Sequence, residues 1–429
     1  MGGILRQYGP MVYLPSLVFS LGEGAMVPLI PVIATQRGAD IPTAALVASA
    51  IVVGTLFGNL PAGWLVGRIG ERLTMAIAGA VALLGAVGCA VLPGLVWFAA
   101  AVFVIGMAAA AFALARHAFM ATRVPLAFRA RALSLLGGST RFGLFIGPFL
   151  AAALLALFGA AGSALWFFAA LMVALIVLVL VGPDPEEQFQ VESPSAGTAG
   201  RRPPGGDGVL TALWRARAVL ARVGVACMLL AAVRAARQVV LPLWGVSIGM
   251  DASAIALVVG VSGALDFALF YASGQVMDRY GRLWAALPSM LLMSAGFVAL
   301  AFTRDASHAS AWFAALAGLL GLANGLSSGI LMTVGADLAP AGSTASFLGA
   351  WRLLTDSGGA LAPVMVAVVA AAASLPLATA LVGALGLAGA AGLLRWGPRY
   401  LPRGRPGDVR GSRGTMTSRR ARTTRGRPR

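Results

Sequence analysis

Long apolar runs fill most of the chain and are separated by short polar segments. Twelve of these runs are about 20 residues long, enough for an α-helix to cross about 30 Å of hydrocarbon. Strands of a membrane β-barrel would be about ten residues long and would alternate in polarity, whereas residues 165–182 are apolar throughout. The pattern predicts an all-α polytopic membrane protein. Its twelve transmembrane helices are expected at residues 11–34, 43–66, 73–92, 96–121, 132–158, 163–182, 219–247, 253–276, 284–303, 311–335, 345–370 and 375–395.

Arginine is distributed unevenly between the two sets of loops that these helices define. If the N-terminus is cytoplasmic, the cytoplasmic segments hold almost all of the loop arginines, and the opposite loops hold only Arg37 and Arg304. Cytoplasmic loops of membrane proteins are enriched in arginine and lysine. We therefore expect a multi-pass protein of the cell membrane (inner or plasma membrane) with both termini in the cytoplasm.

The composition supports a membrane location and excludes several other classes of function. Only 11% of the residues are charged, against about 25% in soluble proteins. The two cysteines, Cys89 and Cys227, lie in different apolar runs, so neither a metal site nor a disulfide framework is predicted. The chain has no H-E-x-x-H or G-x-S-x-G motif, and we expect neither enzyme activity nor a cofactor.

The last segment, residues 397–429, is rich in arginine and lacks a long apolar run. A basic tail can bind nucleic acid, but this one has neither aromatic residues interleaved with the basic ones nor a folded reader domain. We predict a disordered cytoplasmic tail that helps to set the topology and contacts anionic lipid headgroups. No nucleic-acid partner is expected.

The same charged turn occurs twice, as "GWLVGRIGER" from Gly63 and as "GQVMDRYGR" from Gly274. Offsets of 211 residues upstream and 215 residues downstream align much of the two halves. Many transporters consist of such repeated halves. We predict two six-helix bundles, at 1–182 and 218–396, joined by a cytoplasmic linker at 183–217 that is rich in proline, glycine and charge.

Twelve helices, two repeated halves, a long central loop and a "GxxxDRxGR"-type turn between helices 2 and 3 and again between helices 8 and 9 resemble the major facilitator superfamily. The resemblance covers the chain from about Met11 to Arg395. It implies a fold of two pseudo-symmetric six-helix bundles, a small-molecule substrate and transport by alternating access, with the protein acting as a monomer.

The region from helix 4 to helix 5, "LARHAFMATRVPLAFRARALSLLGGSTRFGLFIGP", resembles bacterial drug:proton antiporter-like members of the superfamily. Their helix 5 motif is similar to G-x-x-x-G-P, which Gly143, Gly147 and Pro148 match. The glycine pair that follows in those members is Ala151-Ala152 here, and Val102 stands where proton-driven members carry an arginine in helix 4.

Charged residues inside the predicted helices are the main candidates for function. A charge at mid-bilayer costs about 2.5–3.5 kcal/mol on insertion scales, so it normally faces a partner or a water-filled cavity. None lies in helices 3, 6, 9 or 12, which the resemblance implies are the helices that face lipid. The intramembrane candidates are Glu23, Arg116, His117, Arg141, Arg234, Arg237, Asp266, Arg352 and Asp356.

Roles for these residues follow from their type and depth. We expect Glu23 to be the main proton-exchanging group, with Asp266 as the reserve, because both carboxylates lie near the middle of a helix. The alternative is that the charges only pair with one another and stabilise the packing. The candidates for the substrate cavity are Arg234, Arg237, Arg141, Asp356, Gln238, Asn59 and Asn324.

The repeated turn is predicted to take part in gating. The resemblance implies that Asp278 contacts the start of helix 5, near Arg129 and Arg131, whereas Gly67 at the equivalent position of the first copy cannot make the matching contact. The glycines are expected to allow close approach and a tight reversal. The full set of gating candidates is Gly63, Arg68, Gly70, Gly274, Asp278, Arg279, Gly281, Arg282, Arg129, Arg131, Arg116 and Arg352.

Three functions remain open at this point. Five intramembrane arginines exceed three carboxylates, which favours a neutral, zwitterionic or anionic amphipathic substrate. The first function is proton-coupled efflux of such a molecule. The second is import or facilitated passage of an anionic metabolite, with Arg141, Arg234 or Arg237 as the anion clamp. The third is a transport-inactive membrane sensor or assembly protein.

Overall fold

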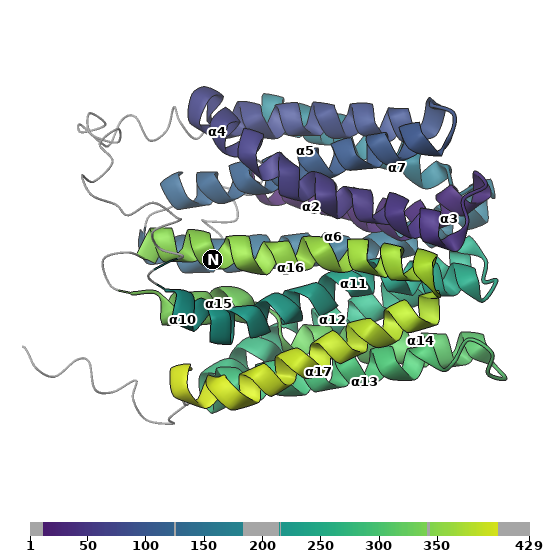
Figure 1. Ribbon diagram of the computed structural model, residues 1–429. Coiled ribbons are helices and arrows are strands. Elements are labelled where there is room, and N and C mark those ends of the chain that lie inside the picture. Colours follow the sequence, from purple (N-terminus) through teal and green to yellow (C-terminus); the bar gives the residue numbers. More distant parts are fainter. Residues whose placement is uncertain (1–11, 124–125, 183–213, 215, 341–343, 402–429) are drawn as a thin grey trace, which may run out of the picture.

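A computed structural model describes residues 12–123, 126–182, 214, 216–340 and 344–401. Throughout these residues the regular structure is helical, and the helices lie side by side along one common direction (Figure 1). Twelve segments are long and apolar enough to cross a membrane, at positions close to those expected from the hydrophobic pattern. The predicted all-α polytopic fold is confirmed.

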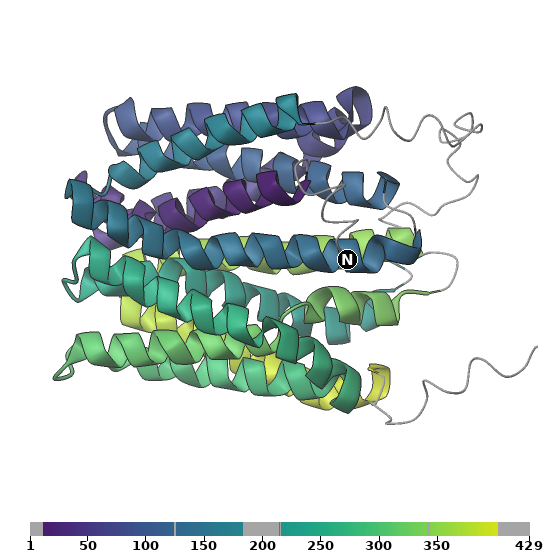
Figure 2. The same cartoon turned by 180° about the vertical axis from the view of Figure 1, so that it is seen from behind.

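The helices form two bundles, with α6 and α16 between them in the view of Figure 1 and in the reverse view of Figure 2. The first bundle comprises α2 (Leu14–Met26), η2 (Val27–Leu29), α3 (Ile30–Gln36), α4 (Ile41–Val91), α5 (Leu95–Arg123), α6 (Leu126–Phe158) and α7 (Ser163–Val181). The second comprises α10 (Arg217–Val219), η3 (Leu220–Gly224), α11 (Val225–Ser247), α12 (Ala252–Tyr280), α13 (Arg282–Ala301), α14 (Ala309–Leu326), α15 (Ile330–Leu338), α16 (Thr344–Ala372) and α17 (Leu375–Tyr400).

The bundles contact each other mainly through two helix pairs, α6 with α12 and α4 with α16. Most of the predicted linker (183–217) and of the tail (397–429) lies outside the described residues, so the boundaries of these segments stay a prediction. We call the end of the bundles where α7 ends and α10 begins the linker end, which is on the left in Figure 1. The opposite end, with the turns after α3 and α11, is the far end.

Helix caps at the far end repeat between the bundles. Asp40 precedes α4 and accepts a hydrogen bond from the backbone N–H of Thr43 at 2.9 Å. Asp251 precedes α12 and accepts one from Ala254 at 2.8 Å. An aspartate at this position satisfies one of the free N–H groups of the first helical turn. The two caps are 211 residues apart, the spacing that aligns the two halves of the sequence.

The two copies of the charged turn also share a conformation at the linker end. Gly70 and Gly281 have φ angles of 81° and 95°, a region that favours glycine. Helices 2 and 3 share the label α4, but they are two separate membrane spans, as expected, and Gly70 leaves the helical conformation within that element. The close approach expected at Gly274 is not found, since a methyl group there would meet no atom within 4 Å.

Two transmembrane helices are broken in their middle. The first is interrupted by the 3₁₀ turn η2, where Pro28 and Pro31 remove backbone donors. The tenth was expected to be continuous but stops at Leu326 and restarts at Ile330, with Gly329 at a φ of 77°. Serine and glycine favour turns over helix interiors, and Ser327, Ser328 and Gly329 form this break.

Candidate functional site

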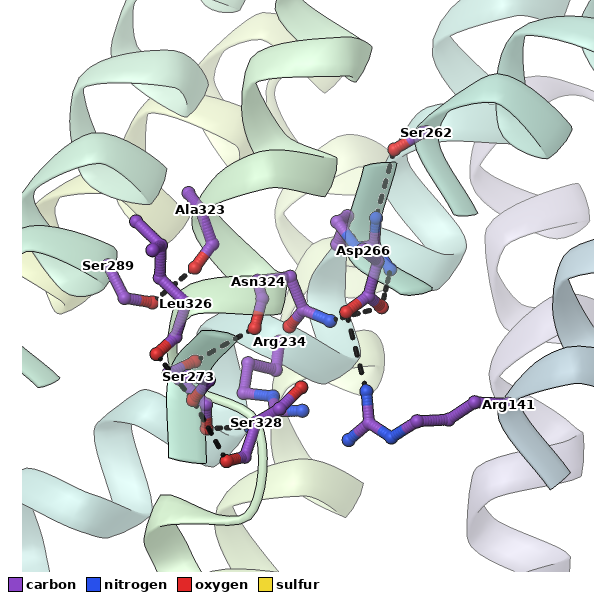
Figure 3. Close-up of polar contacts among 12 residues, drawn as sticks. Arg141, Arg234, Ser262, Asp266, Ser273, Ser289, Ala323, Asn324, Leu326 and Ser328 are labelled. Atoms are coloured by element: carbon purple, nitrogen blue, oxygen red, sulfur yellow. Dashed lines mark hydrogen bonds and ion pairs between the residues drawn. The ribbon is translucent and has the colours of Figure 1, made fainter. Parts of the chain in front are cut away.

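A cluster of charged and polar side chains centred on Asp266 lies where four transmembrane helices meet (Figure 3). Asp266 belongs to α12. Its Oδ1 lies 3.4 Å from Nη1 of Arg141 in α6, and its Oδ2 lies 3.4 Å from Nη2 of Arg237 in α11. Asn324 in α14 donates a hydrogen bond from Nδ2 to the same Oδ2 at 2.7 Å. One carboxylate thus joins helices of both bundles.

Small residues allow α14 to approach α12 at this point. A methyl group at Gly325 would lie 2.7 Å from the backbone oxygen of Asp266, and one at Gly321 would collide with the backbone of Ser262. The hydroxyl of Ser262 donates to the carbonyl of Ala317 at 2.6 Å and accepts a bond from Nη1 of Arg237 at 2.9 Å. The close approach of the α14 and α12 backbones therefore places the polar groups of the cluster within hydrogen-bonding distance of one another.

Arg141 reaches the cluster from the first bundle. Its helix, α6, packs tightly on α2, because methyl groups at Gly143 and Gly147 would lie within 3 Å of the α2 backbone. This agrees with the close helix approach that the G-x-x-x-G spacing favours. The guanidinium group of Arg141 lies 4.6 Å from the centroid of the Phe270 ring, which gives it a cation–π contact in addition to the ion pair.

Arg234 lies beside the cluster and binds the broken helix. Its Nη1 donates to the carbonyl of Ser327 at 3.0 Å, and the hydroxyl of Ser273 lies within hydrogen-bond distance of the carbonyls of Leu326 and Ser328, at 2.8 and 3.1 Å. The Ser327 carbonyl also accepts a bond from the backbone N–H of Ile330 at 3.3 Å. Polar side chains thus supply hydrogen bonds to the carbonyls at the break, as expected for irregular backbone inside a membrane protein.

The charges of the cluster do not balance. Arg141 and Arg237 pair with Asp266, and Arg234 interacts electrostatically with all three of these groups. With Arg234 included, the cluster holds three guanidinium groups and one carboxylate, a net charge of +2. Buried polar atoms without a partner in the described part of the chain include Nε of Arg237 and Oδ1 of Asn324. The cluster therefore has both charge and hydrogen-bonding capacity left for another group.

Aromatic rings line the contact between α6 and α12 next to Arg141. The Phe145 ring stacks on Phe267 at a centroid distance of 5.7 Å, and Phe142 meets the same ring edge-on at 5.8 Å. Phe149 continues the row towards the far end and would touch a methyl group at Gly260 of α12. An apolar aromatic surface thus adjoins the positive cluster.

Glu23 lies in α2 and is not joined to the described members of this cluster by a hydrogen bond or an ion pair. Its electrostatic partner is Arg116 of α5, which donates from Nη1 to the hydroxyl of Thr140 at 3.0 Å. No hydrogen bond or ion pair joins the Glu23 carboxylate to another described residue. Glu23 and Arg116 balance each other in charge, in contrast to the cluster around Asp266.

The other cavity candidates lie outside the Asp266 cluster. Asp356 and Arg352 are one turn apart on α16, exposed and electrostatically coupled to each other. Gln238 and Asn59 are exposed, and among the described residues no side-chain hydrogen bond joins either of them to the cluster. Of the seven expected cavity residues, the structure thus brings together Arg141, Arg234, Arg237 and Asn324, around a carboxylate expected to be the reserve proton site.

One of the gating candidates, Arg282, pairs with a residue that the sequence did not single out. Arg282 donates from Nε to Asp337 of α15 at 2.8 Å and lies 3.4 Å from Asp278, which is 83% exposed. The side chains of Arg129 and Arg131 lie outside the described ones, so the expected contact with Asp278 stays a prediction. Asp337 follows the break in the tenth helix. Its charge near the linker end is the feature of the sequence that could have identified it as a partner.

Comparison with known proteins agrees with this architecture. The sequence profile of the Major Facilitator Superfamily matches residues 12–363. A solved structure described as a POT family transporter in complex with a thioalcohol conjugated peptide is similar at a TM-score of 0.73 and 12% identity, covering 92% of this chain and 96% of that one. For the nucleoside transporter NupG the values are 0.69 and 12%, covering 91% and 99%.

A bacterial homolog of the human lysosomal transporter Spinster, in an inward-facing and unoccupied conformation, is similar at a TM-score of 0.67 and 13% identity, covering 93% of this chain and 97% of that one. At these identities the likeness shows the fold alone. No curated protein sequence matches the chain.

Proposed function

Because the chain belongs to the major facilitator superfamily, we propose that it is a proton-coupled transporter that exports a small amphipathic organic anion by alternating access. The family and the fold indicate a membrane transporter. The observation that favours an anion is the net charge of +2 in the Asp266 cluster. The resemblance to drug:proton antiporter-like members supports export.

The unbalanced charge indicates a ligand site because such a charge is energetically unfavourable inside a membrane. Uncompensated charges within the membrane are expensive and are found mainly where they serve a substrate or ion pathway. Arginine binds carboxylates and phosphates through two parallel N–H···O bonds, and it remains charged when partly buried. An anion entering the cluster would neutralise part of the excess and occupy the free donors of Arg141 and Arg237.

Asp266 acts in this proposal as an internal substitute for the anion. Its two ion pairs are both 3.4 Å long, whereas the strongest N–H···O contacts between charged groups are about 2.7–2.9 Å. The carboxylate holds the arginines in place when the site is empty, and the incoming anion competes for the same N–H groups. The adjoining rings of Phe142, Phe145 and Phe267 would contact the apolar body of the substrate.

Glu23 is the proton-exchanging group in this proposal. Among the described residues its carboxylate has no hydrogen bond or ion pair, and a carboxyl group without a fixed partner can take up and release a proton with little rearrangement. Asp266, expected as the reserve, is the counter-ion of two arginines, and we assign it to charge balance.

The direction and the topology belong to the same proposal. We place the linker end in the cytoplasm, since Arg68, Arg72, Arg279 and Arg282 lie there and the far end carries only Arg37 and Arg304 among the described loop residues. Import of an anionic metabolite is the second candidate, because the arginine cluster would bind an anion arriving from either side. Uptake into inverted vesicles under an imposed pH gradient separates the two directions, and a transport-inactive protein would show flux in neither.

The anion is tested by ligand-induced thermal stabilisation of the purified protein. A ligand that binds only the folded state stabilises it by RT ln(1 + [L]/Kd), so the melting temperature rises with the ligand concentration. Aromatic carboxylic acids are expected to stabilise the wild type, and their neutral amides are not. Arg237→Gln should lose the response, while Arg304→Gln, an exposed arginine at the far end, should keep it. Equal stabilisation by acids and amides would contradict the proposal.

A further inference from the structure

Three arginines from two parts of the chain surround one tryptophan at the linker end. Trp396 lies in the last turns of α17. The guanidinium carbons of Arg395 and Arg399, on the same helix, lie 4.6 and 5.5 Å from the centroid of its ring. Arg222 reaches the ring from η3, at 4.8 Å. We call these three arginines and Trp396 the tryptophan cluster.

The tryptophan cluster is positively charged and has free donors. No ion pair joins any of its arginines to a carboxylate among the described residues. Arg222 donates to the hydroxyl of Tyr400, and the side chains of Arg395 and Arg399 have no hydrogen bond to another described residue. A cation–π contact uses the face of the guanidinium group. The N–H edges, which bind phosphate through paired hydrogen bonds, remain available.

The surroundings place this cluster at the level of lipid headgroups. Tryptophan and tyrosine are enriched at the membrane interface, where their rings lie among the headgroups. Leu387 and Leu394, two turns apart on α17, are 49% and 57% exposed and lead along the helix to Arg395. In a membrane such exposed leucines contact acyl chains. Along α17, arginine N–H groups that can bind a headgroup therefore follow directly on exposed leucines that can contact an acyl chain.

We propose that the tryptophan cluster is a binding site for an anionic phospholipid, with the lipid phosphate held between Arg222, Arg395 and Arg399 and an acyl chain along the exposed leucines of α17. The position of arginines on the cytoplasmic side is already explained by topology, but topology needs only their charge. It does not require three guanidinium groups, from η3 and α17, to meet at one ring. Among the described residues, the other rings at this end that contact an arginine contact a single one, as Trp64 does with Arg68.

Native mass spectrometry of the detergent-purified protein with added lipid tests the site. Phosphatidylglycerol is expected to remain bound in preference to phosphatidylcholine, and inorganic phosphate alone should not raise the melting temperature. Each basic residue contributes about fivefold to binding at an anionic surface. The change of all three arginines to glutamine should therefore weaken phosphatidylglycerol binding about 100-fold, and Arg399→Gln alone about fivefold.

Two further variants separate the site from general charge attraction. Arg304→Gln removes one exposed charge at the far end and should leave lipid binding unchanged. Trp396→Leu keeps every charge but removes the ring that gathers them, and it should weaken phosphatidylglycerol binding. If Trp396→Leu binds as the wild type does, or if phosphatidylcholine is retained equally, no built lipid site exists. Stabilisation by inorganic phosphate alone would indicate a phosphate site in place of a lipid site.

Discussion

Asp266→Asn is the substitution that tests the proposed site most directly. Asparagine has nearly the same shape, but it removes the negative charge that lies 3.4 Å from both Arg141 and Arg237. The cluster then has three positive charges and no carboxylate. Removing one partner of a buried ion pair costs about 3–5 kcal/mol, and the empty variant should therefore melt at a lower temperature than the wild type.

Although the variant should be less stable than the wild type, it should bind anions more tightly. In the wild type, an incoming carboxylate competes with Asp266 for the guanidinium N–H groups. At an effective dielectric constant of about 20, one ion pair at this distance is worth about 5 kcal/mol before the cost of desolvation. If only about 1.4 kcal/mol of competition remains after desolvation, its removal makes the anion bind about tenfold more tightly. Aromatic acids should consequently raise the melting temperature of the variant by more than that of the wild type.

The assay is a melting curve of the purified protein at increasing concentrations of acid and of the matched amide. Asp305→Asn, an exposed aspartate at the far end, is the control for loss of one negative charge. Weaker binding of acids by Asp266→Asn than by the wild type would refute the competition between Asp266 and the anion. Stabilisation of the variant by organic cations would refute the choice of an anionic substrate.

Three further outcomes are expected. Glu23→Gln should abolish flux driven by a pH gradient while the protein remains in the membrane, and unchanged proton coupling in vesicles would exclude Glu23 as the proton site. Gly325→Ala should cost about 1–3 kcal/mol of stability, seen as a lower melting temperature, because its methyl group would lie 2.7 Å from a carbonyl oxygen of α12. Asp337→Asn should lower the melting temperature more than Asp278→Asn, since Asp337 is 24% exposed and bonds Arg282 at 2.8 Å, whereas Asp278 is 83% exposed and lies 3.4 Å away. The reverse order would contradict the importance of that ion pair.

The hydrophobic pattern predicted the twelve helices and the fold class, because length and polarity decide whether a segment crosses a membrane. The offset between Gly63 and Gly274 predicted the repeat, and the matching caps at Asp40 and Asp251 support it. These features depend on local sequence or on its recurrence. Such features can be predicted without knowing which helices pack against each other.

Pairing between charges could not be predicted in the same way. Arg141 and Asp266 are 125 residues apart, and they meet because glycines set how closely and in which rotation their helices pack. The interruption of the tenth helix was also missed, since Ser327, Ser328 and Gly329 add little polarity to an apolar run. Only the structure shows that the side chains of Ser273 and Arg234 contact the carbonyls at this break.

The unbalanced charge of the Asp266 cluster should also make transport sensitive to membrane voltage. A potential of 100 mV is worth about 2.3 kcal/mol for each elementary charge that crosses the whole field. With a net charge of +2 in the cluster, a conformational change that moves it through a tenth of the field is worth about 0.5 kcal/mol. The empty carrier should then favour the conformation in which the cluster is nearer the negative side. A bound dianion would cancel this bias, so the capacitive current of the empty protein should fall when substrate is added.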